Sequence, residues 1–81
     1  MSKSVEMKIS VEYELDVLPP SARVVYQILK ENFRMYIGEI TEESRYSRRT
    51  VQQALRLLEK SHLVSHYPDM HDLRRHKYQL V

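Results

Sequence analysis

Arginine and glutamine side chains at helical spacing are the residues of this sequence best suited to specific chemistry. Five of them share one side of segment 47–60 if that segment is helical: Arg48, Arg49, Gln52, Gln53 and Arg56. In the major groove of DNA, an arginine can pair with both acceptors of a guanine edge, and a glutamine with both groups of an adenine edge. The residue types and their spacing therefore predict a helix that reads bases in double-stranded DNA.

The opposite side of the same segment is apolar. Its apolar residues recur at i, i+3, i+4 and i+7, which is one stripe of a helix: Val51, Ala54, Leu55 and Leu58. Leu57 is expected to widen this stripe. Ser47 is expected to cap the helix by accepting a hydrogen bond from a free backbone N–H of the first turn. A helix packed on a core through this stripe would hold its arginine and glutamine side chains outward.

Charges are divided unevenly along the chain, although the net charge is only +2. Residues 1–44 carry 5 Lys or Arg and 8 Asp or Glu, whereas residues 45–60 carry 5 and 1. Such an asymmetry suits a protein that turns one face to a polyanion and keeps the other face away from it. The alternative is a solvated charged face without a partner, which the glutamines among the arginines disfavour.

Length and composition limit the other functions open to the chain. Its 81 residues suffice for one small domain. The chain contains no cysteine, so we expect no disulfide, no thiolate metal site and a reducing, cytoplasmic location at the nucleoid. No apolar run reaches the ~20 residues that a membrane span needs. The sequence has neither a glycine-rich phosphate loop nor a nucleophile motif, so we expect no enzymatic activity, no cofactor and no small-molecule ligand.

Apolar and polar residues alternate without a break from Val5 to Val17. A period of two predicts a β-strand with one buried and one acidic face, because a helix would place these apolar residues on two opposite faces. Residues 1–17 are therefore expected to form an N-terminal strand extension. So long a strand needs a partner edge. That edge belongs either to the hairpin described below or to a second subunit, in which case residues 5–17 would form a homodimer.

Two further helices are expected before segment 47–60. Residues 18–21, with two prolines, end the strand and begin a helix that runs to about residue 32 or 34, because proline fits the first helical turn. Residues 35–37 are too few for more than a brief extended segment. Gly38, the one glycine of the chain, precedes a short second helix over 39–44. Tyr46 is expected to pack inward and close the following turn.

The last part of the chain is predicted to be a β-hairpin. Residues 63–67 and 75–81 are typical of strands, and residues 68–74 are typical of a loop. Basic side chains gather at its tip and on the returning strand: Arg74, Arg75, His76 and Lys77. The hairpin is therefore expected to present a basic tip.

The order helix, short strand, helix, turn, helix, hairpin predicts an α+β domain, a winged helix-turn-helix over residues 18–81 with a three-helix core and a hairpin wing. This range resembles the DNA-binding domain of archaeal and bacterial transcription regulators, most of all the MarR-like group. LPPSARVVYQIL resembles their first helix, and IGEITEESRYS resembles the supporting helix and turn. SRRTVQQALRLLEKSHLV resembles the recognition helix, and PDMHDLRRHKYQLV resembles the wing. The N-terminal strand has no counterpart in that pattern.

Two turns depart from the resembling group, which often has glycine where this chain has Arg45 and His62. A left-handed backbone costs on the order of 1 kcal/mol in a residue with a Cβ, so we expect these turns to be shaped differently. MarR-like proteins dimerise through additional helices, and their ligand pocket lies near that interface. These helices have no counterpart in the sequence, so neither the dimer nor the small-molecule response is carried over.

The resemblance implies that the recognition helix reads bases from its first two turns. Base edges would be contacted by four residues: Arg48, Arg49, Gln52 and Gln53. Phosphates, which position the protein without reading sequence, would be contacted by Ser47, Thr50 and Arg56. Tyr36 and Thr41 would reach phosphate from the entrance to the second helix. For any one of these side chains, the alternative is a solvated helix surface.

In the wing, Arg74 and Arg75 are candidates to enter the minor groove, whose negative potential attracts arginine. His76 and Lys77 would contact DNA beside them. Asp72 would orient Arg74 through an ion pair. The alternative is an ion pair that only stabilises the loop.

The histidines of the hairpin do not have the spacing of metal ligands on a helix. His66, His71 and His76 are five residues apart, and no cysteine accompanies them. A pairing of His66 with His76 across the hairpin is the one arrangement that could hold a metal, and we expect no metal site. We expect instead that His71 and His76 lie near DNA and strengthen its binding as the pH falls.

The sequence therefore predicts a sequence-specific double-stranded DNA-binding protein, a transcriptional regulator with residues 47–60 in the major groove and residues 68–77 in the minor groove. It would act as a homodimer on a pseudo-palindromic site. One alternative is an architectural protein that coats DNA with little preference. Another is a winged helix that serves as a protein-interaction module, because fold alone does not fix function.

Overall fold

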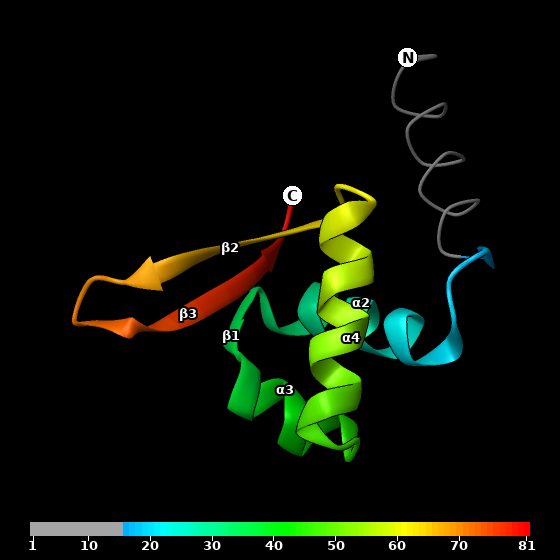
Figure 1. The fold of residues 1–81 in the computed structure, drawn as a ribbon, viewed down its shortest axis with the longest axis horizontal. Coiled ribbons are helices and arrows are strands. Elements are labelled where there is room, and N and C mark those ends of the chain that lie inside the picture. The colour runs from blue at the N-terminus through cyan, green and yellow to red at the C-terminus, as the bar shows by residue number, and fades with distance from the viewer. Residues whose placement is uncertain (1–15) are drawn as a thin grey trace.

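The computed structural model describes residues 16–81, which form an α+β domain (Figure 1). Its helices pack together beside an antiparallel sheet with the strand order β1-β3-β2. The described elements, in chain order, are α2 (Pro20–Asn32), β1 (Arg34–Tyr36), α3 (Ile37–Ser44), α4 (Arg48–Lys60), β2 (Val64–Asp69) and β3 (Asp72–Leu80). This order confirms the predicted winged helix-turn-helix. No helix within residues 16–81 is long and apolar enough to cross a bilayer.

The predicted N-terminal strand lies outside the described residues, apart from its last two. Asp16 and Val17 are not part of the sheet, and the side chain of Val17 is 67% exposed. The strand over residues 5–15 and its pairing partner stay predictions.

Helix α2 begins and ends where the sequence predicts. Pro20 occupies its first turn, where the missing N–H costs no hydrogen bond. Its buried side follows the helical spacing: Ala22, Val25, Ile28 and Leu29. At the other end, the side-chain amide of Asn32 donates to the carbonyl of Ile28 at 2.8 Å, and Phe33 leaves the helix with a positive φ of 67°.

Helix α3 begins at Ile37, two residues earlier than the predicted range of 39–44. The carboxylate of Glu39 accepts a hydrogen bond from the backbone N–H of Tyr36 at 2.8 Å, which stabilises a helix start at this point. Gly38 therefore lies inside the first turn. A side chain there would meet no atom within 4 Å, so packing does not require glycine at this position.

Helix α4 confirms the predicted cap and buried stripe. The hydroxyl of Ser47 accepts a hydrogen bond from the backbone N–H of Thr50 at 3.1 Å. Four side chains are buried as predicted: Val51, Ala54, Leu55 and Leu58. The expectation that Leu57 widens this stripe is wrong, since its side chain is 37% exposed. Leu57 lies about 100° around the helix from Leu58, beyond the edge covered by neighbouring elements.

The core lies between the helices and one face of the sheet. Its largest fully buried side chains come from all three helices: Leu29, Ile40, Leu55, Leu58, Val25 and Val51. Strand β3 adds Tyr78 and Leu80, and Tyr46 packs against the core as predicted. Because this core takes only the inner stripe of α4, the outer side of that helix stays in solvent.

The hairpin strands extend much further than predicted. Residues 68–74 are expected to form a loop, whereas only Met70 and His71 separate β2 from β3. Pro68 is compatible with β2 because this strand is at the edge of the sheet, where one side needs no N–H donor. The carboxylate of Asp69 accepts the backbone N–H of His71 at 2.9 Å and tightens the turn. The wing is thus a long hairpin that projects away from the helices (Figure 1).

Left-handed backbone occurs at both turns where a different shape was expected. Arg45 ends α3 with φ 63°, and His62 follows α4 with φ 61°. The expectation was wrong because the helices and strands on either side must pack on one core, which fixes the path of each turn. The strain, on the order of 1 kcal/mol for a residue with a Cβ, is outweighed by that packing.

Candidate nucleic-acid interface

The outer side of α4 carries the arginine and glutamine residues singled out from the sequence, and all of them are exposed: Arg48, Arg49, Gln52, Gln53 and Arg56. They fall into two groups. By helical spacing, Arg49 and Gln53 lie opposite the buried stripe, at the outermost line of the helix. Arg48, Gln52 and Arg56 lie nearer the wing, where they line a groove.

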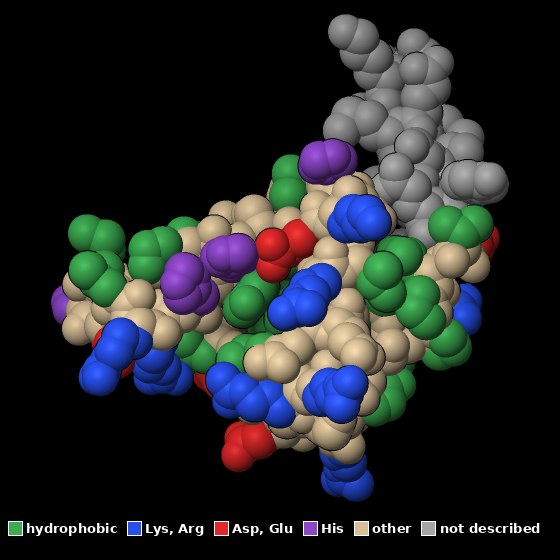
Figure 2. All heavy atoms as spheres, in the orientation of Figure 1, with side chains coloured by type: hydrophobic (Ala, Val, Ile, Leu, Met, Phe, Trp, Pro, Cys, Tyr) green, Lys and Arg blue, Asp and Glu red, His purple; other side chains and the backbone are tan. Residues whose placement is uncertain are grey.

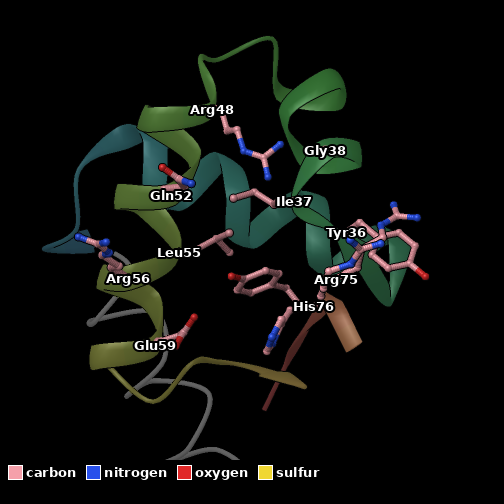
Figure 3. A pocket seen from close by; sticks show the side chains of 12 residues that line it. Tyr36, Ile37, Gly38, Arg48, Gln52, Leu55, Arg56, Glu59, Arg75 and His76 are labelled. Carbon is pink, nitrogen blue, oxygen red and sulfur yellow. The ribbon is translucent and has the colours of Figure 1, made fainter. Parts of the chain in front are cut away.

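This groove separates α4 from the base of the wing and has a volume of about 390 Å³. In Figure 3, Arg48, Gln52 and Glu59 come from α4 on one wall, and Arg75 and His76 come from β3 on the other. Apolar side chains between the two walls, among them Ile37 and Leu55, separate the groove from the core. Residues far apart in sequence therefore meet in one concave surface.

Positive charge dominates the face that contains this groove. Figure 2 shows Lys and Arg side chains along α4 and again at the outer part of the hairpin, on the same face. The groove lining includes Arg48, Arg56, Arg74 and Arg75 against one carboxylate, that of Glu59. Such a surface attracts a polyanion, and its concave shape focuses the field.

The predicted ion pair between Asp72 and Arg74 is confirmed. The guanidinium Nε of Arg74 lies 3.4 Å from Oδ1 of Asp72, which also accepts the backbone N–H of Arg74 at 3.1 Å. The Arg74 side chain is nevertheless 93% exposed. An ion pair so exposed contributes little to stability, so its main effect is to direct the side chain of Arg74 outward from the tip.

Tyr36 joins the wing to the helical body. Its hydroxyl donates a short hydrogen bond to Oδ2 of Asp69 at the far end of β2. The guanidinium of Arg75 lies 3.6 Å from the centre of its ring, and Nζ of Lys77 lies 5.5 Å from it. These cation–π contacts and the hydrogen bond hold two wing cations against the short strand β1.

The link between Tyr36 and Asp69 shifts the pKa of both groups. The hydrogen bond from Tyr36, helped by the backbone N–H of His71, lowers the pKa of Asp69 below its ordinary value of 3.8. The same hydrogen bond, with some desolvation, raises the pKa of Tyr36 above 10.0. The pair is therefore neutral tyrosine with ionised aspartate over the whole physiological range.

Hydroxyl groups predicted to contact phosphate already have partners within the protein. The proton of Tyr36 is donated to Asp69, so a contact from this hydroxyl to phosphate would require breaking that bond. The hydroxyl of Thr41 donates to the carbonyl of Ile37 at 2.8 Å. The hydroxyl of Ser47 lies 2.9 Å from that of Thr50, and if Ser47 donates there, Thr50 keeps its own proton for an external acceptor.

The histidines of the hairpin include the cross-strand pair considered from the sequence, His66 with His76. The rings of His66 and His76 are 5.0 Å apart and nearly perpendicular, and Nδ1 of His66 lies 3.0 Å from a carboxylate oxygen of Glu59. His76 is half-buried, and its Nδ1 has no hydrogen-bond partner within residues 16–81. His76 thus packs at the base of the wing, between His66 and the groove, whereas His71 is exposed at the turn.

In the part of the chain that the structure describes, no group of three or more His, Cys, Asp or Glu side chains is placed to hold a metal ion. The neighbouring Tyr78 has a raised pKa, because it is desolvated by burial and lies near Glu59. The contacts among Glu59, His66, His76 and Tyr78 join α4 to both strands of the wing.

Sequence reasoning missed the contacts of Tyr36 and the pairing of His66 with Glu59. Tyr36 and Asp69 are 33 residues apart, and they meet only because β1 pairs with β3 and places Tyr36 opposite Lys77. No local pattern signals such a contact. The sequence raised the pairing of His66 with His76 across the hairpin, but Glu59 reaches His66 from a different element.

Comparison with known proteins identifies the fold. No protein-family model and no curated protein sequence matches the chain. Among solved structures, a mutant of MepR from S. aureus bound to an oligodeoxyribonucleotide matches with a TM-score of 0.77 and 24% identity, over 99% of this chain and 61% of MepR. The transcriptional regulator PA4135 gives 0.76 and 21%, over 98% and 60%. ZitR of Lactococcus lactis, a zinc-responsive MarR family member, gives 0.72 and 22%, over 79% and 44%.

These matches identify the fold and give the share of each matching chain that this chain covers. The chain spans about three fifths of the length of MepR and of PA4135. MepR is from S. aureus and ZitR is from Lactococcus lactis, and both organisms are bacteria. With three helices, an antiparallel sheet and a projecting hairpin in the same arrangement, the described domain has the winged-helix fold of the MarR-family transcription regulators.

Proposed function

We propose that this chain is a sequence-specific double-stranded DNA-binding protein that regulates transcription. The observation that carries the proposal is the exposed arginine and glutamine side of α4, which shares one face with the cations of the wing. Support also comes from the likeness to MepR, whose mutant is bound to an oligodeoxyribonucleotide. Such a protein would be found at the nucleoid.

Helix α4 would lie in the major groove. Arg49 and Gln53 project furthest from the core and would reach base edges, and Arg48 and Gln52 would contact bases or phosphates on the side of the wing. Arginine can pair bidentately with guanine and glutamine with adenine. Phosphate contacts would come from Thr50 and Arg56 near the start and middle of the helix, and Ser47 would support Thr50 through the bond between their hydroxyls. A strand of the duplex would occupy the groove between α4 and the wing.

The wing would enter the adjacent minor groove. The ion pair with Asp72 directs Arg74 outward, while Tyr36 holds Arg75 and Lys77 closer to the body. Arg74 would therefore reach into the minor groove, where the potential is most negative. Arg75 and Lys77 would meet the flanking phosphates. His76, being half-buried beside His66, would support the wing from within.

The chain would act as a homodimer on a pseudo-palindromic site, with residues 5–17 as the contact between subunits. Half-sites would then be about one helical turn apart.

The test is a selection of bound sequences from a random DNA pool at fixed salt. A sequence-specific regulator is expected to enrich one motif with two related halves, and to bind it at least 10³-fold more tightly than random duplex. Enrichment of no motif, with similar affinity for all duplexes, would instead assign a low-specificity architectural role. A protein that ignores duplexes at low salt would point to a protein-interaction module and would remove the proposal.

A further inference from the structure

Two large apolar side chains are exposed at the tip of the wing. Met70 is 85% exposed in the turn, and Leu73 is 65% exposed at the start of β3. They flank His71 and Asp72 and therefore lie within a few residues of each other at the end of the hairpin furthest from the helices (Figure 1).

These two side chains lie outside the core of the domain. The turn is already closed by the hydrogen bonds from the backbone N–H groups of His71 and Arg74 to Asp69 and Asp72. Neither Met70 nor Leu73 belongs to the core or packs against it. An apolar tip remote from the core suggests a contact made outside the molecule.

Two arginines follow this apolar tip in the chain, and the first of them is paired with Asp72 of the tip. Arg74 follows Leu73 directly, with its side chain 93% exposed, and Arg75 is the next residue. A partner that accepts both the cations and the apolar side chains must combine negative charge with an apolar interior. Duplex DNA has both, since its phosphates flank grooves whose stacked bases are apolar. A purely apolar pocket on another protein would leave Arg74 without a complement.

The base of the tip is attached to the helical body. Asp69, the last residue of β2, is buried and bonded to Tyr36 of β1, and Arg75 lies on the ring of the same tyrosine. A hairpin held by these contacts would place an apolar side chain against the bases while α4 lies in the adjacent major groove.

We propose that Met70 and Leu73 form an apolar wedge that enters the minor groove, partly unstacks one base step and bends the duplex. This proposal rests on the proposed function, because it requires that the protein binds duplex DNA. Apolar wedges of this kind kink DNA by roughly 20–90°. The step would be of the pyrimidine–purine class, because such steps unstack most easily.

The experiment uses the full chain and a duplex carrying the motif obtained by selection. The duplex has 2-aminopurine at the step under the wing, whose fluorescence rises on unstacking, and a dye pair at its ends that reports bending. Binding of the native protein is expected to raise the fluorescence at least twofold and to shorten the end-to-end distance. The double variant Met70→Ser, Leu73→Ser is expected to lose both signals, while its affinity falls by about tenfold or less because the phosphate contacts of α4 remain.

Two variants serve as controls. Val81→Ser removes an equally exposed apolar side chain (83% exposed) beyond the other end of β3 and should keep both signals. Met70→Leu keeps the tip apolar and should also keep them.

The outcomes separate the wedge from the proposed function. Tight binding of the native protein without unstacking or bending would overturn the wedge and leave the proposed function intact, as would unchanged signals in the double variant. Failure of the native protein to bind any duplex would overturn both. If the double variant alters the mass of the free protein in solution, the tip is covered by a second copy, and the wedge is overturned.

Discussion

At the scale of single residues, Tyr36 controls more of the wing than its position in a three-residue strand would indicate. One side chain bonds Asp69 through its hydroxyl and receives Arg75 and Lys77 on its ring. The pKa of Asp69 is lowered by this hydrogen bond, and the pKa of Tyr36 is raised by it. Both shifts favour the neutral tyrosine and the ionised aspartate. The stabilisation by this hydrogen bond is therefore lost in strong acid, where Asp69 becomes protonated, and in strong base, where Tyr36 becomes ionised.

Replacement of Tyr36 by Phe is expected to destabilise the domain between about pH 4 and pH 10. Because the pKa of folded Asp69 is lowered, its contribution is complete above 3.8 and is lost as the pH falls through the folded value. Because the pKa of folded Tyr36 is raised, its contribution is complete below 10.0 and is lost as the pH rises through the folded value. Urea unfolding of both proteins from pH 2.5 to pH 7 should show a difference that narrows in acid.

Tyr46→Phe is the matched control for this series, since Tyr46 packs against the core from the turn between α3 and α4. Its effect should be independent of pH over the same range. A Tyr36→Phe difference that stays constant down to pH 2.5 would contradict the assigned hydrogen bond.

Arg49 is the residue on which base reading by α4 is most directly tested. Arg49→Ala is expected to weaken binding of the selected motif by about 1–3 kcal/mol, roughly 5- to 150-fold, and to relax preference at one base pair. Arg23→Ala, an exposed arginine on α2, should change neither. Competition binding against duplexes mutated one base pair at a time measures both quantities. A uniform loss across all sequences would make Arg49 a phosphate contact.

At the scale of elements, α4 owes its orientation to the contrast between its two sides. Its inner stripe is buried against α2, α3 and β2, and its outer side is free for a partner. The cap by Ser47 satisfies the Thr50 N–H at the end of the helix that would meet DNA.

Loss of that cap should cost stability in a graded way. Ser47→Ala is expected to lower the free energy of unfolding by about 0.5–2 kcal/mol, because the first turn loses an acceptor, whereas Ser47→Gly should cost only a few tenths. Chemical denaturation of the three proteins gives the comparison. An unchanged free energy of unfolding in Ser47→Ala would indicate that the hydrogen bond accepted by the Ser47 hydroxyl does not stabilise the helix.

A substitution in the left-handed turn after α4 is expected to stabilise the domain. His62→Gly is expected to raise stability by up to about 1 kcal/mol, since glycine adopts φ 61° without the clash of a Cβ. Arg23→Gly, inside α2, should lower stability by about 1 kcal/mol. Thermal unfolding of the two variants should therefore shift in opposite directions. A destabilised His62→Gly protein would mean that the imidazole contributes more than the strain costs.

At the scale of the whole molecule, the apolar core and the cationic surface occupy different parts of the domain. The helices and one face of the sheet share the core, and the outer side of α4 and the wing carry the cations (Figure 2). The groove between them is formed by side chains from β1, α3, α4 and β3, so it exists only in the folded domain.

The proposed homodimer predicts a change in mass when residues 1–17 are removed. The full chain is expected to sediment as a dimer and the shortened chain as a monomer, because the shortened chain lacks the proposed contact. The shortened chain should keep the thermal unfolding transition of the domain, since it retains every residue of the described core, from Ala22 on, and Leu18, which packs against that core. A full chain that sediments as a monomer at micromolar concentration would remove this part of the proposal.

The sequence by itself determined the local elements. The apolar spacing from Val51 to Leu58, the prolines before α2 and the serine before α4 act on neighbours within one or two turns, so their effect can be read from the order of residues. The exposed side of α4 was also predictable, because it lies opposite the buried stripe. The ion pair of Asp72 with Arg74 was also predictable, because the two residues are two apart.

Only the tertiary structure decided which distant residues meet. The link from Tyr36 to Asp69, the pairing of His66 with Glu59 and the groove between α4 and the wing all depend on strand register and on how α4 packs beside the sheet. The same is true of the left-handed turns at Arg45 and His62, where packing on either side overcomes the preference of the local residue. The backbone preference of a single residue is worth about 1 kcal/mol. The core combines the burial of a dozen side chains, so packing overrides that preference wherever the two conflict.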